Sequence, residues 1–278
     1  MGSLSGKTII ITGASRGIGR AMALKFAADG ANLVIAAKSD QPHPKLPGTI
    51  HSVVEEVEAA GGRGLAVQVD VRFEDQVARM VDRSVARFGG IDVLINNAGA
   101  ISLTPVEKTS VKKYDLMQQI NSRGVFLCSR AALPHLKKAA NPHILSLAPP
   151  LNTAPQWLAG HAPYTLSKYG MTLLSLGMAA EFSAYGIAVN TLWPRTIIAT
   201  AAIEFAVGDR DTFRFCRKPD IMADAAYEII TTPEVALTGQ TVIDDELLSQ
   251  RGVTDFEMYR YDPDFTGDLF PDLFIENA

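Results

Sequence analysis

A tyrosine and a lysine four residues apart form the pair of side chains in this sequence that is best suited to proton transfer. Tyr164 and Lys168 lie in the stretch HAPYTLSKYG, residues 161–170, among small and apolar residues. On a helix, positions four apart project from the same face, so both side chains can enter one crevice. A nearby ammonium lowers the pKa of a phenol from its ordinary value of about 10, which suits a general acid or base. The alternative is a tyrosine half buried in a core helix, and the spacing alone does not decide.

A glycine-rich stretch near the start of the chain is suited to phosphate binding. The sequence TGASRGIGR, residues 12–20, follows a β-branched run and opens a helical pattern. In this context Gly13 permits a tight turn, Gly17 lets a pyrophosphate approach the backbone, and Gly19 lets the helix pack on the sheet. Unpaired N–H groups and the dipole at the helix start favour negative charge. These features predict a dinucleotide site; glycines that serve only turn and packing are the alternative.

The end of the second predicted strand distinguishes between the two nicotinamide dinucleotides. NAD sites commonly place an acidic residue about 20 residues beyond the glycines, where it binds the ribose hydroxyls. Here Ala37 and Lys38 occupy that position, and Asp40 lies beyond the strand in a proline-rich loop. Lys38 and Arg16 would attract a 2′-phosphate because both side chains are cationic. The sequence therefore predicts NADP (NADPH) as the cofactor, unless Lys38 is simply an exposed loop lysine.

Strands and helices alternate along the chain. Nearly continuous apolar runs predict strands that are covered on both faces, at residues 8–12, 31–37, 64–71, 92–97, 143–148, 186–193 and 240–244. Helical patterns lie between them, and several end in glycine. This order predicts an α/β fold: a single doubly wound Rossmann-type domain over residues 1–278, with a seven-stranded, mainly parallel sheet and helices on both faces.

Three segments interrupt the alternation. They are the proline-rich residues 39–49, residues 198–220, and the tail from about residue 247, so that the core spans about 6–245 and residues 246–278 form a C-terminal extension. Loops at the carboxyl ends of parallel strands form the ligand crevice, which makes the first two segments candidates for a cofactor rim and a substrate lid. The tail has no partner element in the pattern. Solvated loops are the alternative for all three.

Composition excludes several classes of protein. The 278 residues are 47% hydrophobic and 20% charged, as in an ordinary globular domain. A net charge of −4 argues against a dedicated nucleic-acid-binding protein, and the five histidines and two cysteines show no metal-site spacing. No apolar run reaches the length of a membrane span, and the start of the chain leaves no room for a signal peptide. We therefore expect a soluble, cytoplasmic protein that holds no metal.

Four short motifs, in their order and at their distances, resemble the short-chain dehydrogenase/reductase family. They are TGASRGIG at 12–19, NNAG at 96–99, Asn121 within INSRG, and YTLSK at 164–168. The resemblance implies an oxidoreductase that transfers hydride between a nicotinamide cofactor and a carbonyl or alcohol. It also implies that Tyr164, Lys168 and Asn121 are catalytic, with Asn121 anchoring a water that links Lys168 to bulk solvent. For Asn121, the alternative is a mid-helix asparagine that bonds its own backbone.

The resemblance further implies which residues contact the cofactor. Asp70 would contact the adenine ring, the NNAG segment would lie against the adenosine ribose, and the segment after the sixth strand would hold the nicotinamide edge. The predicted cofactor-binding residues are Gly13, Ser15, Arg16, Gly17, Ile18, Gly19, Lys38, Asp70, Val71, Asn97, Ala98, Gly99, Lys168, Pro194 and Ile197.

Family members are usually homo-oligomers, dimers or tetramers, and the helix that carries Tyr164 offers small residues for such a contact. They are Gly170, Gly177, Ala179 and Ala180. The alternative is that these residues pack against the sheet.

One expected hydroxyl is missing from the pattern. Family members usually place a serine about thirteen residues before the tyrosine, where it hydrogen-bonds the reacting carbonyl. Counting back gives Leu151, whereas aligning the strand gives the Ala-Pro pair at 148–149. Ser146 lies further back in the strand, where alternation turns it away, and Asn152 or Thr153 are the candidate substitutes. Losing one such donor commonly costs a few kcal/mol of transition-state stabilisation, roughly 3 kcal/mol, which slows an enzyme without abolishing its activity.

A second departure is Arg195, which stands where a glycine usually follows the proline. Its side chain would reach the nicotinamide or an acidic substrate group, or else point to solvent. The predicted pocket wall is mostly apolar and comprises residues 148–151, Trp157, Leu158, Phe205, Phe213 and Phe215. If these residues line the crevice rather than the core, a hydrophobic carbonyl or alcohol is the expected substrate.

The sequence therefore predicts an NADP-dependent oxidoreductase in which Tyr164 is the general acid/base. Two other functions stay open. The first is a nucleotide-binding protein with weak or no catalysis, because the usual serine is missing. The second is an epimerase or dehydratase on the same scaffold.

Overall fold

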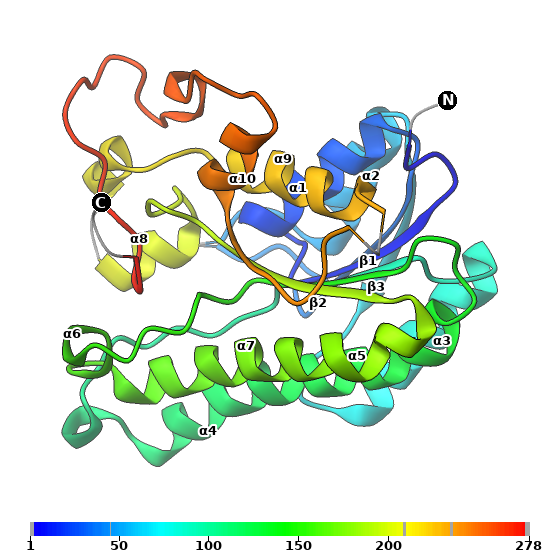
Figure 1. Ribbon diagram of the computed structural model, residues 1–278, viewed down its shortest axis with the longest axis horizontal. Helices are drawn as coiled ribbons and strands as arrows, with labels where there is room; N and C mark the ends of the chain where they lie inside the picture. Colours follow the sequence, from blue (N-terminus) through cyan, green and yellow to red (C-terminus); the bar gives the residue numbers. More distant parts are fainter. Residues whose placement is uncertain (1–2, 45, 208–209, 234–235, 276–278) are drawn as a thin grey trace.

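A seven-stranded parallel sheet runs through the centre of the molecule (Figure 1). The computed structural model describes residues 3–44, 46–207, 210–233 and 236–275, without the side chains of residues 205–207. The strands are β1 (Thr8–Thr12), β2 (Asn32–Ala37), β3 (Arg63–Gln68), β4 (Val93–Asn96), β5 (His143–Ser146), β6 (Ala188–Trp193) and β7 (Thr241–Ile243). Their order is β3-β2-β1-β4-β5-β6-β7, so the direction of winding reverses between β1 and β4. In open α/β sheets, the crevice at such a reversal binds ligands.

Burial explains why the apolar runs form strands here. Every residue of β1, β2, β4, β5 and β6 is buried, as expected of parallel strands covered on both faces. The edge strand β3 begins and ends with exposed residues. It stops at Gln68, earlier than the predicted residue 71, because the Gln76 side chain takes the backbone N–H of Asp70. The predicted α/β fold with helices on both faces is confirmed.

Helices cover both faces of the sheet, each over its own hydrophobic cluster (Figure 1). One face carries α1 (Gly17–Ala28), α2 (Ile50–Ala59), α9 (Asp220–Thr231) and α10 (Asp244–Gln250). The other face carries α3 (Glu74–Phe88), α4 (Val111–Ile120), α5 (Ser122–Leu136) and α7 (Ala162–Phe182). Within the described part of the chain, no helix is both long and apolar enough to cross a membrane.

The segments between β5 and β7 that interrupt the alternation contain short helices. They are α6 (Pro155–Leu158), α8 (Ala201–Val207) and the 3-10 helix η3 (Arg210–Phe215). Two further 3-10 turns, η1 (Val106–Lys108) and η2 (Ser183–Tyr185), lie before α4 and after α7.

The tail beyond β7 does have partner elements, contrary to the sequence prediction. After α10 it forms the 3-10 helix η4 (Glu257–Tyr259), where the Tyr259 hydroxyl donates to Asp224 over 2.7 Å. It then runs back to the carboxyl end of β6, where Pro271 pairs with Thr196 in an antiparallel bridge. Phe274 is buried near the end of the described chain. These contacts were invisible in the sequence because they join residues far apart along the chain.

Candidate active site

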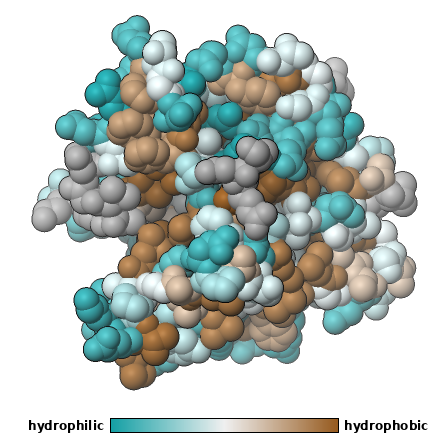
Figure 2. Space-filling model, turned by 60° about the vertical axis from the view of Figure 1, so that its left-hand side comes forward, coloured by the Kyte–Doolittle hydropathy of each residue, from teal (hydrophilic) through white to brown (hydrophobic). Residues whose placement is uncertain are grey.

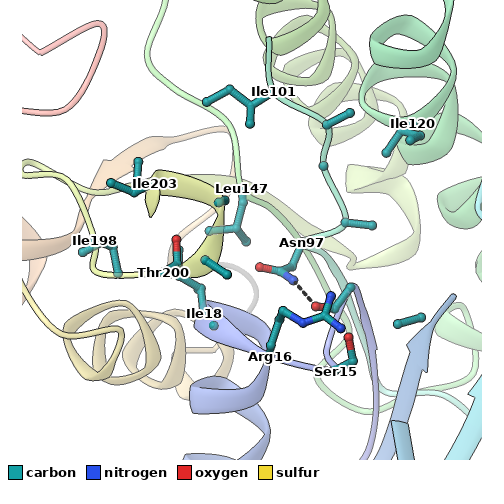
Figure 3. Close-up of a pocket in the computed structure, with 18 of the residues that line it drawn as sticks. Ser15, Arg16, Ile18, Asn97, Ile101, Ile120, Leu147, Ile198, Thr200 and Ile203 are labelled. Atoms are coloured by element: carbon teal, nitrogen blue, oxygen red, sulfur yellow. Dashed lines mark hydrogen bonds between the residues drawn. The ribbon is translucent and has the colours of Figure 1, made fainter. Parts of the chain in front are cut away.

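A cavity of about 660 Å³ lies at the carboxyl ends of the central strands, where the winding reverses. The glycine loop, the ends of β2, β4 and β6, and helix α7 all contribute to its wall. Figure 3 shows the side chains of Ser15, Arg16 and Ile18 from the glycine loop across from Ile101 and Leu147. Every predicted cofactor-binding residue lines the cavity except Gly19, which is buried behind the loop. Tyr164 lines the same cavity, whereas Asn121 does not. Hydrophobic residues gather along the hollow on this side of the molecule (Figure 2).

The glycine loop needs its glycines for two different reasons. Gly13 has φ 69° and Gly17 has φ 56°, in the left-handed region that side chains disfavour. A Cβ at Gly13 would lie 2.8 Å from the Cα of Ala98, so even a methyl group would displace backbone. Gly19 has no such φ, but a Cβ there would lie 2.6 Å from Nδ2 of Asn97. The loop is therefore packed closely against the segment after β4.

Asn97 ties the glycine loop to the centre of the sheet. Its Nδ2 donates to the backbone oxygen of Thr12 over 2.8 Å. It also donates to the backbone oxygen of Gly13 over 3.2 Å (Figure 3). The Thr12 hydroxyl accepts the backbone N–H groups of Asn97 and Ala98, each over 3.1 Å. These bonds hold the start of α1 at the cavity, with the first backbone N–H groups of the helix free of intrahelical partners.

Arg16, Lys38 and Ser39 lie together at the end of the cavity beyond β2, which we call its far end. Arg16 donates from Nη2 to Oγ of Ser39 over 2.8 Å and from Nε to the backbone oxygen of Pro47 over 2.9 Å. It therefore holds the proline-rich loop against the glycine loop, and this loop contributes Ser39 and Leu46 to the wall. The side chain of Lys38 is 61% exposed, and its Nζ lies 3.4 Å from Oδ2 of Asp70.

Asp70 is the acidic group at this end of the cavity, and its charge is matched by neighbours. Arg72 donates to both carboxylate oxygens of Asp70, over 3.0 Å from Nε and 2.7 Å from Nη2. Partial burial acts to raise the pKa of Asp70, but the hydrogen bonds from Arg72 and the charge of Lys38 outweigh it and hold that pKa below its ordinary value. Asp70 therefore stays ionised and paired.

Tyr164 and Lys168 project together from α7 into the near end of the cavity. Lys168 donates from Nζ to the backbone oxygen of Leu147 over 2.6 Å, and Nζ lies 5.0 Å from the centre of the Trp193 ring. Burial lowers the pKa of Lys168 to about 8, although Asp272 acts to raise it. Burial also raises the pKa of Tyr164, and the charge of Asp272 raises it further. The pKa of the phenol is therefore raised rather than lowered, against the sequence expectation, because burial removes the hydroxyl from water.

Asp272 is a site residue that the sequence analysis missed. It lines the cavity near Lys168, and its Oδ1 accepts the backbone N–H of Leu273 over 2.6 Å. Burial raises the pKa of Asp272 to about 7, against the opposing effect of Lys168. No motif surrounds this aspartate in the sequence, and only the path of the tail brings it here.

Asn121 lies at the junction of α4 and α5 rather than within one helix. Its Oδ1 accepts the backbone N–H of Ala100 over 2.8 Å, and its Nδ2 donates to the backbone oxygen of Ala100 over 3.0 Å and to Oγ of Ser167 over 2.8 Å. The side chain therefore joins the segment after β4 to α7, one residue away from Lys168. Bonding to its own helix backbone is not the role of this side chain.

No hydroxyl from the segment after β5 replaces the missing serine. Ala148 is fully buried, and Ser146 turns away to accept a hydrogen bond from Oγ of Ser175 over 3.1 Å. Asn152 uses its Oδ1 to accept the backbone N–H of Ala154, and Thr153 is exposed. Neither residue lines the cavity.

Arg195 points neither to the nicotinamide end of the cavity nor freely into solvent. Its Nε donates to Oδ1 of Asp245 over 2.8 Å, and its Nη2 donates to Glu246. Both acids belong to the first turn of α10, so the arginine ties the end of β6 to that helix.

None of the described side chains of the predicted pocket wall lines the cavity. Phe213 is buried beside Ala199 and Cys216, and Phe215 stacks on Phe270 at 4.4 Å. The side chain of Phe205 lies outside the described residues, and Leu158 is 39% exposed. Aliphatic residues line the cavity instead: Ile101, Leu103, Leu147, Ile197, Ile198, Ile203 and Leu273.

Comparison with known proteins finds the same architecture elsewhere. Hydroxysteroid dehydrogenase-like protein 2 of Danio rerio is 54% identical over 99% of this chain. The chain spans only 65% of the length of that relative. A crystal structure from Xanthomonas campestris, provisionally named a dehydrogenase, is 55% identical, with a TM-score of 0.94 and 99% of each chain covered.

More distant structures differ in the cofactor they carry. A metagenomic short-chain oxidoreductase in complex with NADP has a TM-score of 0.72 and is 27% identical, covering 87% of this chain and 97% of its own. The NADH-dependent reductase A1-R', complexed with NAD, has a TM-score of 0.70 and is 27% identical over the same shares. The family model described as short chain dehydrogenase matches residues 7–207, from the first strand through α8. With the glycine loop, Tyr164 and Lys168 all on one cavity within that range, the chain belongs to the short-chain dehydrogenase family.

Proposed function

We propose that this chain is an NADP-dependent oxidoreductase that transfers hydride between nicotinamide and a small hydrophobic carbonyl or alcohol. The observation that carries the proposal is that Tyr164, Lys168 and the glycine loop line one continuous cavity. The cofactor supplies or accepts the hydride when bound. The apolar wall around Ile101, Ile197 and Leu273 suits a substrate with little charge.

The residues present fit a dinucleotide. The cavity surface at Gly17 is a cradle that a side chain would obstruct, because a Cβ there would lie 3.3 Å from Cγ2 of Thr200. The start of α1 directs unpaired backbone N–H groups to this surface, where a pyrophosphate gains most. Gly13, Ser15, Arg16 and Ile18 would hold the phosphates. Asp70 and Val71 would lie at the adenine, Asn97, Ala98 and Gly99 at the ribose, and Pro194, Ile197 and Lys168 at the nicotinamide end.

The choice of NADP follows from the charges beyond β2. Arg16, Lys38 and Ser39 converge on one end of the cavity, and no acid stands directly at the end of the strand. The nearby Asp70 is already paired with Arg72 and Lys38. A 2′-phosphate would therefore meet cations and a hydroxyl there.

Proton transfer falls to Tyr164. In reduction its hydroxyl gives a proton to the substrate oxygen, and in oxidation it takes that proton back. When the Lys168 amine is protonated and lies beside the cofactor, its positive charge would favour the ionised form of the Tyr164 phenol. Asn121 would keep Lys168 in place by joining α7 to the Ala100 segment, and a water near Asn121 would carry the proton to solvent.

The test is oxidation of NADPH and NADH against a panel of aldehydes and ketones. We expect turnover with NADPH, and we expect Tyr164→Phe to lower kcat by about 100-fold to 10,000-fold while NADPH affinity stays unchanged. Tyr114→Phe, at a half-exposed tyrosine of α4, is the matched control and should leave kcat unchanged. Equal rates for the native chain and Tyr164→Phe would exclude the mechanism.

A nucleotide-binding protein with little turnover is the second candidate. The absence of a hydroxyl from residues 146–153 on the cavity favours it. Tight NADPH binding without oxidation of any substrate in the panel would support this second function.

We also propose a cytoplasmic homo-oligomer. The two free cysteines, Cys128 and Cys216, are both buried, which suits a reducing compartment. Leu166 and Leu173 on α7 are 55% and 58% exposed and offer an apolar face to a second copy. Gly170 does not belong to that face, because a Cβ there would lie 2.9 Å from Cβ of Ser122 on α5.

A further inference from the structure

The last described residues form a strap over the active site. We call Phe270–Ile275 the C-terminal strap. The backbone N–H of Ile197 donates to the Phe270 oxygen over 3.0 Å, and that of Asp272 donates to the Arg195 oxygen over 2.9 Å. Further along, Nε1 of Trp193 donates to the Leu273 oxygen over 2.9 Å. These bonds carry the strap across the carboxyl end of β6 and bring Phe274 to α7.

Phe274 is enclosed in a chamber of aromatic rings. It is 2% exposed, and its ring lies nearly parallel to that of Tyr164, at an angle of 24° and a centroid distance of 6.4 Å. The other members of this aromatic chamber are Trp157, His161, Tyr169 and Trp193, at centroid distances of 6.1, 6.1, 5.2 and 6.0 Å. A phenyl-sized ring therefore already fills the space beside the proposed proton donor.

The chamber is the space that a substrate needs. Tyr164 lines the cavity that fits a dinucleotide, and its ring also contacts Phe274. A substrate oxygen must come within hydrogen-bond distance of the Tyr164 hydroxyl. The carbon skeleton attached to that oxygen has to extend beside the tyrosine, where Phe274 now lies.

Two further observations indicate that Phe274 is a replaceable occupant. Nε1 of Trp157 and Nε2 of His161 are buried, and neither has a hydrogen-bond partner among the described residues. A phenyl side chain cannot supply an acceptor, whereas a carbonyl or hydroxyl oxygen can. Phe274 also has φ 71°, and within the described part of the chain it is the one non-glycine residue with positive φ. A bulky residue keeps that strained backbone only while its surroundings hold it there.

We propose that Phe274 occupies the substrate chamber of this enzyme, and that a substrate with a six-membered ring bearing a carbonyl or hydroxyl replaces it when the C-terminal strap moves away. This inference rests on the proposed oxidoreductase function. Phe274 thus sets the size of the ring that the site accepts. It also sets the free energy that is needed to expose Tyr164 to a substrate.

The first experiment locks the strap. Thr196 and Pro271 face each other as a non-hydrogen-bonded antiparallel pair, since the flanking residues make the two ladder bonds. Such pairs have Cα atoms about 4.5 Å apart, within the range of about 4.4–6.8 Å that a disulfide spans. In Thr196→Cys/Pro271→Cys, oxidation should weaken benzyl alcohol binding by about 10-fold or more, and reduction should restore it. Equal affinity in the oxidised and reduced forms would overturn the proposal.

The second experiment removes the occupant. Both tryptophans of the chain, Trp157 and Trp193, contact Phe274, so their fluorescence reports directly on the chamber. In Phe274→Ala, benzyl alcohol should bind about 10-fold more tightly than in the native chain, because no ring has to be displaced. Phe73→Ala, which removes a phenyl group exposed at 46%, is the matched control and should leave the affinity unchanged. Unchanged or weaker binding in Phe274→Ala would overturn the proposal.

These experiments distinguish failure of the Phe274 proposal from failure of the proposed oxidoreductase function. Benzyl alcohol binding is read by fluorescence and needs no turnover, so both experiments still decide the role of Phe274 if no substrate is ever reduced. The oxidised Thr196→Cys/Pro271→Cys variant should bind NADPH with the same affinity as the native chain, because the closed strap leaves the dinucleotide cavity open. If the oxidised variant lost NADPH binding, the strap and the dinucleotide site would not be independent, and the proposal would be overturned.

Discussion

The glycine loop and the C-terminal strap both line the cavity that contains Tyr164, but different contacts hold them. The loop is bound within the core: the Gly13 N–H donates to the Ala36 oxygen over 2.7 Å, and Asn97 bonds the loop from the other side. The strap is bound by the two ladder bonds to Arg195 and Ile197, by a bond from the Phe270 N–H to the Phe215 oxygen, by the indole bond of Trp193, and by the rings of Phe270 and Phe274. The proposed cofactor side of the site is therefore built into the sheet, whereas a segment distant in the sequence adds the proposed substrate side.

In the proposed function, this difference would let the loop bind the cofactor and the strap select the substrate. A pyrophosphate has one shape, so a rigid backbone cradle suits it. Substrates vary, and a segment held by few hydrogen bonds opens at a lower free energy than a core strand. The strap also brings Asp272 into the cavity, so part of the electrostatics beside Lys168 depends on it.

The largest loss of affinity and stability should come from a substitution in the glycine loop. Gly13→Val forces a branched side chain into φ 69° and against the backbone of Ala98. We expect NADPH affinity to fall by about 100-fold or more, and the free energy of unfolding to fall by roughly 3 kcal/mol. Titration calorimetry and urea denaturation would measure both. Gly177→Ala, where a Cβ meets nothing within 4 Å, should be neutral or slightly stabilising; equal behaviour of the two variants would show that the loop is not a rigid cradle.

The next effect concerns the strap and depends on pH. The pKa of Asp272 rises from its ordinary value of 3.8 to about 7 in the folded chain. Because the folded chain binds this proton more tightly than the unfolded chain, the stabilisation is present at low pH and is lost as the pH rises from about 4 to about 7. Asp272→Asn should remove that loss.

We therefore expect Asp272→Asn to match the native chain near pH 4 and to exceed its free energy of unfolding at about pH 8 by on the order of 2 kcal/mol, with allowance for water in the cavity. Urea denaturation across this range gives the measurement. Asp268→Asn, at an exposed aspartate of the same tail, serves as control. A native stability that does not fall between these pH values would mean that folding does not raise the pKa of Asp272.

A smaller effect tests the phosphate end of the cavity. Lys38→Ala removes a cation from beside Asp70 and from the proposed 2′-phosphate position. NADPH should bind about 10-fold more weakly, and NADH affinity should stay the same. Lys108→Ala, at an exposed lysine of η1, controls for the change in net charge. Loss of affinity for both dinucleotides alike would argue against a 2′-phosphate contact.

The smallest effect tests how the strap is held. Trp193→Phe removes the indole bond to the Leu273 oxygen, which is worth about 1 kcal/mol. The backbone N–H of Asp272 should then exchange with solvent about 5-fold faster, as hydrogen exchange would measure. Trp157→Phe loses no such bond among the described residues and is the matched variant. The same exchange rate in both variants would mean that the indole bond does not help to hold the strap.

Local patterns predicted the cofactor side of the site. The glycines at 13 and 17 were recognisable because positive φ and close backbone approach demand that residue type. Tyr164 and Lys168 were placed on one face by helical spacing, and the structure puts both on the cavity. Arg195 was not predictable in the same way, because its partners lie about 50 residues further along the chain, on α10.

The sequence by itself determined the order of strands and helices, the glycine loop and the tyrosine–lysine pair, because each depends on residues that are neighbours along the chain. Only the tertiary structure decided what lies against that pair. Asp272 and Phe274 reach Tyr164 and Lys168 across roughly a hundred residues of chain, and no periodicity records a contact of that kind. The pKa of the tyrosine was decided in the same way, since burial depends on the whole fold rather than on the spacing of two residues.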